Sequence, residues 1–456
     1  MSQTTRLADG LATPRRYWAA LTLLLSLTIT VLDSAMINVA LPTIAKSLEI
    51  DPAAIVWVVI AYNLIVVVSL LPMSALAERI GFRPLFVLGL SIFGLASILS
   101  AMAESLAGLI LARVLQGLGS AMLMCLFGGL TRGIYPLHKL GKGISLNAMT
   151  VGFMLVLGPT LGALLLEWVS WRWIFFANIP LCLLGYCGAR FLPEPPRQSG
   201  RFDWLACLLS VPVFGLSIIG LDALVKQPLI AVLCFLLAGI AAWTLVRRSR
   251  DQLAPIVPVD LLRITPIAYA VGASAFSFAA QASAFVVLPF YFQQTHGYGY
   301  TEVGMLLGAW SVGMALMAPV AGVLSDRYAV AFLSGLGAAG IALGLGGVLL
   351  VPAQTHFAWL AAAMGVAGVG FGFFQTPNNR AMLAGAPLSR SGAAGGMQAT
   401  TRVFGQSFGT TLVGLSFHLS TTYGASLGVG VAIACALAAL VINVFRARSA
   451  VKDISL

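Results

Sequence analysis

The chain has 456 residues, of which 59% are hydrophobic and only 9% charged, and its mean hydropathy is +0.96. Soluble globular proteins carry about 25% charged residues, so there is too little polar surface here to coat a water-soluble body. This composition excludes a soluble enzyme, a secreted disulfide scaffold and a disordered chain. The net charge of +11 does not indicate nucleic-acid binding, because the basic residues stand in short loops between apolar segments. The sequence predicts a polytopic membrane protein.

Fourteen apolar runs are long enough to cross a bilayer, which takes about 20 helical residues each. In chain order they are Tyr17–Leu41, Ala54–Leu76, Leu85–Met102, Leu106–Leu130, Ile144–Leu166, Trp173–Phe191, Trp204–Leu224, Leu229–Val246, Ile267–Phe292, Val303–Leu324, Val330–Val351, Phe357–Pro377, Gly392–Phe417 and Gly424–Phe445.

The distribution of basic residues predicts the orientation of these spans. An even number of spans places both termini on one side of the membrane. Nearly all of the 26 Lys and Arg residues fall on that side; Arg113 and Arg402 lie within spans, and the exceptions on the other side are Lys46, Arg172 and Lys226. Because cytoplasmic loops carry an excess of Lys and Arg, we expect both termini to be cytoplasmic.

Three short patterns recur at a spacing of about 250 residues, which indicates an internal duplication. They pair Ser74–Gly81 with Gly322–Arg327, Leu137–Gly141 with Leu388–Gly392, and Gly158–Gly162 with Gly405–Gly409. The predicted domains are therefore an N-terminal six-helix half over 1–200, an inserted helix pair with a cytoplasmic linker over 201–262, and a C-terminal six-helix half over 263–456.

Five short motifs carry a resemblance to a known family. They are Leu32–Pro42, Glu78–Arg83, Arg113-x-x-Gln116-Gly117-x-Gly119, Gly158-Pro159-x-x-Gly162, and Trp171–Phe175 followed by Asn178-x-Pro180. Together they resemble the major facilitator superfamily, and more narrowly its fourteen-span drug:proton antiporter branch. The chain departs from the family pattern at Ser74, Glu78, Phe82, Met154 and Ala163. The resemblance implies an all-α integral membrane protein with the major facilitator fold and 14 transmembrane helices, in the bacterial inner membrane.

Asp33 lies deep within the first span, where an acid is costly unless it is paired or neutralised and is functional by default. Arg113 on the fourth span is its most plausible partner, because arginine stays charged and offers a planar fork to a carboxylate. We therefore assign proton coupling to Asp33 and Arg113. Two alternatives stay open: a permanent salt bridge that only locks helices, and an Arg113 that serves packing alone.

Two groups of residues are candidates for conformational gating. One consists of charges at helix ends, which could form ion pairs that break on switching: Glu78, Arg79, Arg83, Asp326 and Arg327. The other is Gly158, Pro159 and Gly162, which combine a kink with a flat surface for close helix packing. The alternatives are solvated loop charges and simple local bending.

Candidate residues of a substrate cavity are polar or aromatic groups deep in apolar runs. They are Tyr62, Asn63, Gln281, Trp310, Phe374, Gln375, Asn378 and Arg402. Aromatic faces bind flat or cationic molecules, although core or lipid packing is the alternative for each ring. Arg402 has no obvious acidic partner in the C-terminal spans, and this weakens an interpretation based on cationic cargo alone.

These features predict a proton-coupled secondary transporter that exports amphipathic organic compounds such as drugs, biocides or dyes by alternating access. Competition between proton and cargo for the Asp33 carboxylate would couple the two flows. The alternative, motivated by Arg402, is a metabolite exporter or a proton symporter for anionic or neutral small molecules. A receptor and a membrane enzyme are less consistent with the chain, which shows neither a long signalling tail nor a catalytic constellation.

The expected partners are the lipid bilayer, protons and a small-molecule substrate, with no nucleic acid, and we expect a monomer. No cofactor is predicted, because no phosphate-binding Gly-rich loop is evident and the proton gradient would supply the energy. No metal site is predicted either, since the four histidines lack metal-ligand spacing.

Overall fold

The computed structural model describes residues 10–136, 140–194, 204–225, 227–249, 259–325, 327–350, 352, 356–386, 391–420 and 422–454. These residues are almost entirely helical, and no strand occurs among them. In chain order the elements are α1 (Arg15–Ser47), α2 (Pro52–Ile55), α3 (Trp57–Ile80), α4 (Phe82–Ala101), α5 (Leu106–Met124), α6 (Phe127–Ile134), α7 (Leu140–Trp168), α8 (Arg172–Phe176), α9 (Asn178–Gly188), the 3₁₀ turn η2 (Ala189–Phe191), α10 (Trp204–Asp222), α11 (Pro228–Ser249), α12 (Val259–Leu262), α13 (Thr265–Thr295), α14 (Tyr300–Leu324), α15 (Val330–Leu350), α16 (Phe357–Ala384), α17 (Ser391–Leu419) and α18 (Gly424–Ile454).

Thirteen helical segments of the described chain are long and apolar enough to cross a membrane. The expected span Gly392–Phe417 is not among them, although it forms helix α17, which has 29 residues. At 1.5 Å per residue this helix is about 44 Å long, more than the roughly 30 Å of a hydrocarbon core. Helix α17 differs from the thirteen segments in composition, since it is rich in Ser, Thr and Gln. It can carry these polar residues because it is packed among other helices.

Several hydroxyl groups of α17 bond to the backbone of the same helix, whereas the buried Oγ1 atom of Thr400 has no hydrogen-bond partner among the described residues. Thr401 donates to the Met397 carbonyl at 2.7 Å, and Ser407 donates to the Val403 carbonyl at 3.0 Å. Thr410 repeats the pattern by donating to the Gln406 carbonyl at 2.8 Å. Such bonds to the preceding turn remove most of the cost of placing hydroxyls in an apolar bundle.

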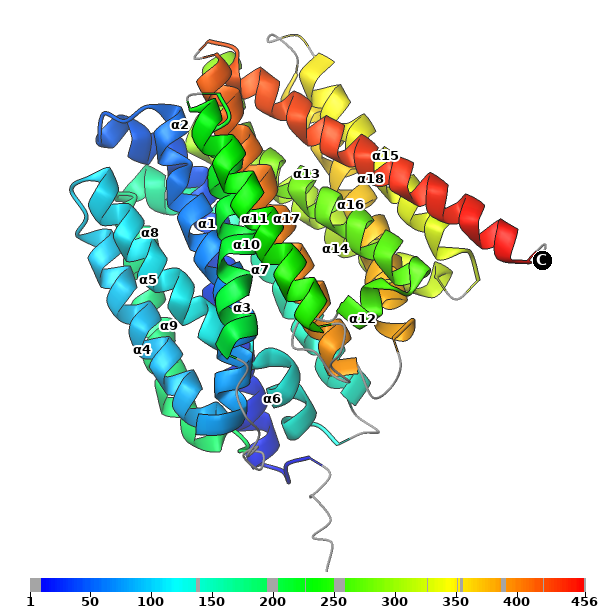
Figure 1. The fold of residues 1–456 in the computed structure, drawn as a ribbon. Coiled ribbons are helices and arrows are strands. Elements are labelled where there is room, and N and C mark those ends of the chain that lie inside the picture. Colours follow the sequence, from blue (N-terminus) through cyan, green and yellow to red (C-terminus); the bar gives the residue numbers. More distant parts are fainter. Residues whose placement is uncertain are drawn as a thin grey trace, which may run out of the picture.

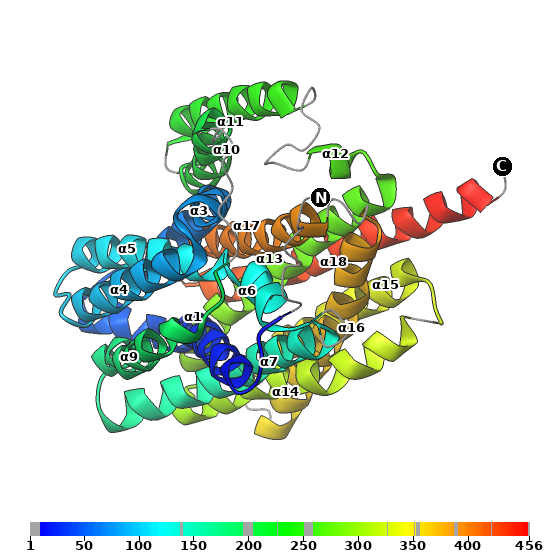
Figure 2. The ribbon, with the colours of Figure 1, turned by 90° about the horizontal axis from the view of Figure 1, so that it is seen from below.

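The helices form two groups with an additional pair at the side (Figures 1 and 2). We call α1–α9 the first half and α13–α18 the second half. They meet where α7 packs against α14 and α3 packs against α17. The pair α10 and α11 stands outside both halves, and α10 contacts α3 of one half and α17 of the other. A polar contact also links these two helices, with His418 Nε2 of α17 lying 3.8 Å from Asp222 Oδ1 of α10.

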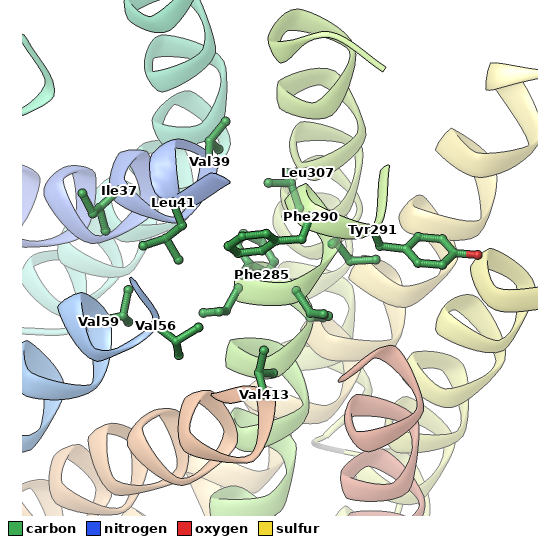
Figure 3. Packing of buried hydrophobic residues seen from close by; sticks show 14 of the residues in the cluster. Ile37, Val39, Leu41, Val56, Val59, Phe285, Phe290, Tyr291, Leu307 and Val413 are labelled. Carbon is green, nitrogen blue, oxygen red and sulfur yellow. The ribbon is translucent and has the colours of Figure 1, made fainter. Parts of the chain in front are cut away.

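The bundle has two ends that are structurally different. We call the end that carries α2 the α2 end, and the opposite end, where α1 begins and α18 finishes, the terminal end. At the α2 end the halves close on one another through buried apolar side chains (Figure 3). We call this cluster the plug and define it as Ile37, Leu41, Val56 and Val59 of the first half with Phe285, Phe290 and Val413 of the second.

Contacts between α7 and α14 add to this closure. Thr301 donates a short hydrogen bond to Glu167, and Ser311 donates to the Leu155 carbonyl at 2.7 Å. A Cβ placed on Gly304 would meet Ala163 and the backbone of Pro159, so these two helices approach closely. The structure is therefore a form in which the α2 end is shut.

Candidate coupling and cargo site

Asp33 lies in the middle of α1 and is fully buried. Both of its carboxylate oxygens are hydrogen-bonded. Oδ2 lies 2.7 Å from Arg113 Nη1, while Oδ1 accepts from Gln116 at 2.9 Å and from Asn178 at 2.7 Å. A buried carboxylate is tolerated when a cation and several donors surround it, and Asp33 has one cation and two amide donors as partners.

The ion pair hypothesised between Asp33 and Arg113 is present. Arg113 is also fully buried, and its Nη1 atom donates to Gln116 Oε1 at 2.7 Å, one turn along α5. Its Nε atom donates to the Val58 carbonyl at 3.3 Å, and its guanidinium carbon lies 4.2 Å from the centre of the Tyr62 ring. The Nη2 atom is buried and has no hydrogen-bond partner among the described residues.

Asn178 and Ser97 are members of this network that sequence reasoning missed. Asn178 was noted only as part of a family motif, whereas its side chain is fully buried and donates to Asp33. Ser97 on α4 accepts from Gln116 at 3.0 Å. An asparagine or serine in an apolar run is a weak signal, since it shows polarity without showing which distant helix it faces. We call Asp33, Arg113, Gln116, Asn178 and Ser97 the Asp33 network.

Glycines allow the helices around the Asp33 network to approach closely. A Cβ on Gly117 would meet the Tyr62 carbonyl at 2.7 Å, and one on Gly119 would meet the Phe93 nitrogen at 2.7 Å. On α7, a Cβ on Gly158 would collide with Ala35, and one on Gly162 would press on Met36. Helix α7 therefore lies directly against the segment of α1 that follows Asp33, and Pro159 between the two glycines faces α14.

Tyr62 is a member of the predicted cavity set that the structure places beside this network. Its ring is stacked below the Arg113 guanidinium, and its hydroxyl donates to Ser120 Oγ at 2.7 Å. Only 4% of Tyr62 is exposed, so its phenol belongs to the packing around Arg113. It also lies within electrostatic reach of Arg402 on α17.

Three of the predicted cavity residues are packed inside the second half instead. Trp310 has no exposed surface and stands edge-on to Phe285 at 5.6 Å, and Phe374 is 1% exposed among small side chains. Asn378 is fully buried, donates to the Ala270 carbonyl at 2.9 Å, and accepts from Arg446 at 3.1 Å. These three side chains therefore pack in the core of the second half and do not line a substrate cavity in this structure. Aromatic rings and amides can serve in either place.

Arg446 also differs from what the sequence indicates. The sequence places it in the basic flank after the last span, but 93% of its surface is covered and its Nη1 atom donates to Asn378. A long α18 carries it into contact with α16 rather than into water. A basic residue near a helix end looks the same in sequence whether it turns outward or inward.

The remaining cavity candidates are partly accessible. Asn63, Gln375 and Arg402 have intermediate exposure, and Gln281 is 8% exposed directly one turn before the plug residue Phe285. Within the described part of the chain, neither a hydrogen bond nor an ion pair involves the Arg402 side chain. Arg402 is thus an unpaired cation in the interior of the bundle.

The predicted gating charges are placed only in part. Arg83 and Arg327 are exposed, Arg79 is partly exposed and has an interaction of its own, and Asp326 lies outside the described residues, as does the side chain of Glu78. The described residues contain no group of His, Cys, Asp and Glu suited to a metal ion.

Comparison with known proteins identifies the family of this fold. Residues 23–410 match the model described as Major Facilitator Superfamily. The transporter YebQ of Escherichia coli is 40% identical over 90% of this chain and 91% of its own length. The riboflavin transporter RibZ of Clostridioides difficile is 30% identical over 86% of both chains. The multidrug efflux pump LfrA of Mycolicibacterium smegmatis is 28% identical over 89% of this chain and 82% of its own.

Proposed function

We propose that this chain, which belongs to the Major Facilitator Superfamily, uses the proton gradient to export amphipathic organic compounds across a bacterial inner membrane. The chain is a multi-pass membrane transporter and not an enzyme. The proton coupling, the direction and the cargo class are the proposal. One observation carries it: a carboxylate that is fully buried in the middle of a long apolar helix, in an ion pair confined to one half of the bundle.

The Asp33 network is suited to sense a proton because protonation of Asp33 changes the net charge of the network. An ionised Asp33 neutralises Arg113 and accepts from Gln116 and Asn178. Protonation leaves Arg113 as an uncompensated buried charge, which weakens the link between α1 and α5. Since α1 is packed tightly against α7 through Gly158, a shift of α1 is transmitted to the helix that contacts the second half.

The geometry changes the expected route of coupling. Asp33 has no exposed surface, and neighbouring side chains occupy both of its oxygens. Cargo therefore does not need to touch Asp33. In the proposed mechanism the proton and the cargo act on opposite conformational states of the two halves, each favouring the state in which it binds.

The closed α2 end supports a particular step for this structure in the proposed transport cycle. With both termini in the cytoplasm, as the basic loops predict, the α2 end faces outward and the plug separates the interior from the outside. Cargo enters from the terminal end, the halves rock, and the plug opens. Proton binding to Asp33 from outside then favours return. Similarity to RibZ and LfrA supports amphipathic cargo in general terms, because one name specifies riboflavin and the other several drugs.

The test uses purified protein in liposomes with an imposed pH gradient and ethidium as the probe. Wild type is expected to move ethidium against its concentration gradient, while Asp33→Asn binds and exchanges ethidium but no longer responds to the gradient. Asp51→Asn, a change at an exposed acid of the α2 end, serves as the control. A normal response by Asp33→Asn would reject the role of Asp33. Protons that move in the same direction as the cargo would indicate symport instead.

A further inference from the structure

We propose that Arg402 is the specificity-determining residue for the cargo and binds an anionic group on it, so that the favoured cargo class is an amphipathic zwitterion. This inference rests on the proposed function. Arg402 lies on α17, which packs against α3 of the first half and α13 of the second. It is partly exposed, and no hydrogen bond or ion pair of its side chain is found among the described residues.

Helix geometry shows which way this part of α17 faces. Gly405 and Gly409 lie against Ala275 and Ala279 of α13. On another side, Val403 is buried in the cluster that contains Tyr62, and Gly414 lies near Val56 and Ile60. At about 100° per residue, the strip between these two sides carries Arg402, Gln406 and Val413.

This strip is the part of α17 that faces the junction of the halves. Val413 at its α2 end is a plug residue (Figure 3), so the strip begins immediately behind the closure. Gln406 stands one turn from Arg402 and is also partly exposed. Arg402 and Gln406 therefore present a guanidinium fork and an amide on the same face, a combination that suits a carboxylate or a similar group.

Three hydroxyl groups near Arg402 on α17 have hydrogen-bond partners, whereas the Thr400 Oγ1 atom, like the Arg402 side chain, has none among the described residues. The hydroxyls of Thr401, Ser407 and Thr410 are all bonded to the backbone of α17. The acid at mid-membrane, Asp33, is already neutralised by Arg113. A cation left unpaired inside an apolar bundle is costly, and binding an anionic group removes that cost. Aliphatic or permanently cationic cargo would leave Arg402 unpaired and would not remove this cost.

Arg113 determines which charge the remainder of the cargo molecule should carry. Tyr62 lies within electrostatic reach of Arg402 and is also stacked against Arg113, whose guanidinium carbon lies 4.2 Å from the Tyr62 ring centre. A proton on Asp33 leaves Arg113 unopposed, which attracts a purely anionic cargo and repels a cationic group on the Asp33 side. Export driven by proton entry requires the proton and cargo to exclude each other. A zwitterion with its anionic group on Arg402 and its cationic part towards Asp33 meets both conditions.

The experiment compares rhodamine B with its ethyl ester, two dyes that share one cationic aromatic body and differ at a single carboxylate. Equilibrium binding to the full-length protein in lipid nanodiscs is measured by fluorescence anisotropy. We expect wild type to bind rhodamine B about tenfold to a hundredfold more tightly than the ester, as for a charge-assisted bidentate contact. Arg402→Gln should remove this preference, and Arg402→Lys should retain part of it.

Controls separate this result from misfolding and from failure of the proposed function. Arg247→Gln, at an exposed arginine of α11, should keep the wild-type preference. Equal affinities of wild type for the two dyes, or an equal loss for both dyes in Arg402→Gln, would overturn the inference. Transport of rhodamine B in liposomes is the second readout. A carboxylate preference that depends on Arg402, without any response to a pH gradient, would support this inference while rejecting the proposed proton coupling.

Discussion

Asn178 Nδ2 donates to Asp33 Oδ1 at 2.7 Å, which ties the start of α9 to the middle of α1. With the Arg113 ion pair on the other oxygen, this bond encloses the carboxylate within helices of the first half. Neither contact crosses to the second half. A charge change at Asp33 therefore acts first on packing inside one half, and reaches the other half through helices such as α7 that lie against both.

Stability should reveal the Asp33–Arg113 pair through a double substitution. Asp33→Asn leaves Arg113 buried without a counter-charge, and breaking such a pair costs about 3–5 kcal/mol. Adding Arg113→Gln removes the orphaned charge, so the double variant should recover most of the lost stability while its proton response stays absent. Thermal unfolding in detergent measures the first effect. A double variant no more stable than Asp33→Asn would contradict the pairing energetics.

Close packing of α7 against α1 predicts opposite results for two glycines of the same helix. Gly158→Ala introduces a methyl group that collides with Ala35, and overpacking of this kind costs about 1–3 kcal/mol. Gly152→Ala meets no atom within 4 Å and should be neutral or slightly stabilising. Thermal unfolding and transport rate are measured for both. Identical behaviour of the two variants would show that α7 does not approach α1 as described.

The Thr301–Glu167 bond should favour the form with a closed α2 end. Thr301→Val removes one hydrogen bond between the halves, worth about 1 kcal/mol, which shifts the opening equilibrium about fivefold. A cysteine placed at Val59 in the plug, in a background without the native cysteines, reports opening by its reaction with a membrane-impermeant maleimide. The labelling rate should rise in Thr301→Val and stay unchanged in Thr295→Val, an exposed control. No rise would mean that the bond does not hold the closure.

His296 follows α13 at the α2 end and predicts a pH dependence of stability. Burial among Tyr291, Phe292 and Tyr298 lowers the pKa of this histidine from its usual value of about 6.5. The folded protein therefore holds fewer protons than the unfolded chain, and stability is lost as pH falls below about 6.5. The difference in Tm between pH 7.5 and 5 should shrink in His296→Phe. His356→Asn, at an exposed histidine, should retain it, and an equal shrinkage there would assign the effect elsewhere.

The pairing of Asp33 with Arg113 could be predicted because charges in apolar runs are rare. Asp33 and Arg113 stand out in the sequence, and pairing is the physical answer to two opposite charges in hydrocarbon. Asn178 and Arg446 could not be found this way. The first is a modest polar residue near a helix start, and the second resembles the ordinary basic flank of a last span. Their partners lie 145 and 68 residues away, and only folding brings them together.

By itself the sequence determined a helical membrane protein and the residues whose charge demands an explanation, because hydrophobic length and charge are properties of the chain. The tertiary structure decided which face of each helix looks inward. Lipid and protein core are both apolar, so a membrane helix carries little periodicity to distinguish them. For this reason only the packed bundle shows that Trp310 and Asn378 fill the core, while Arg402 has no hydrogen-bond or ion-pair partner among the described residues.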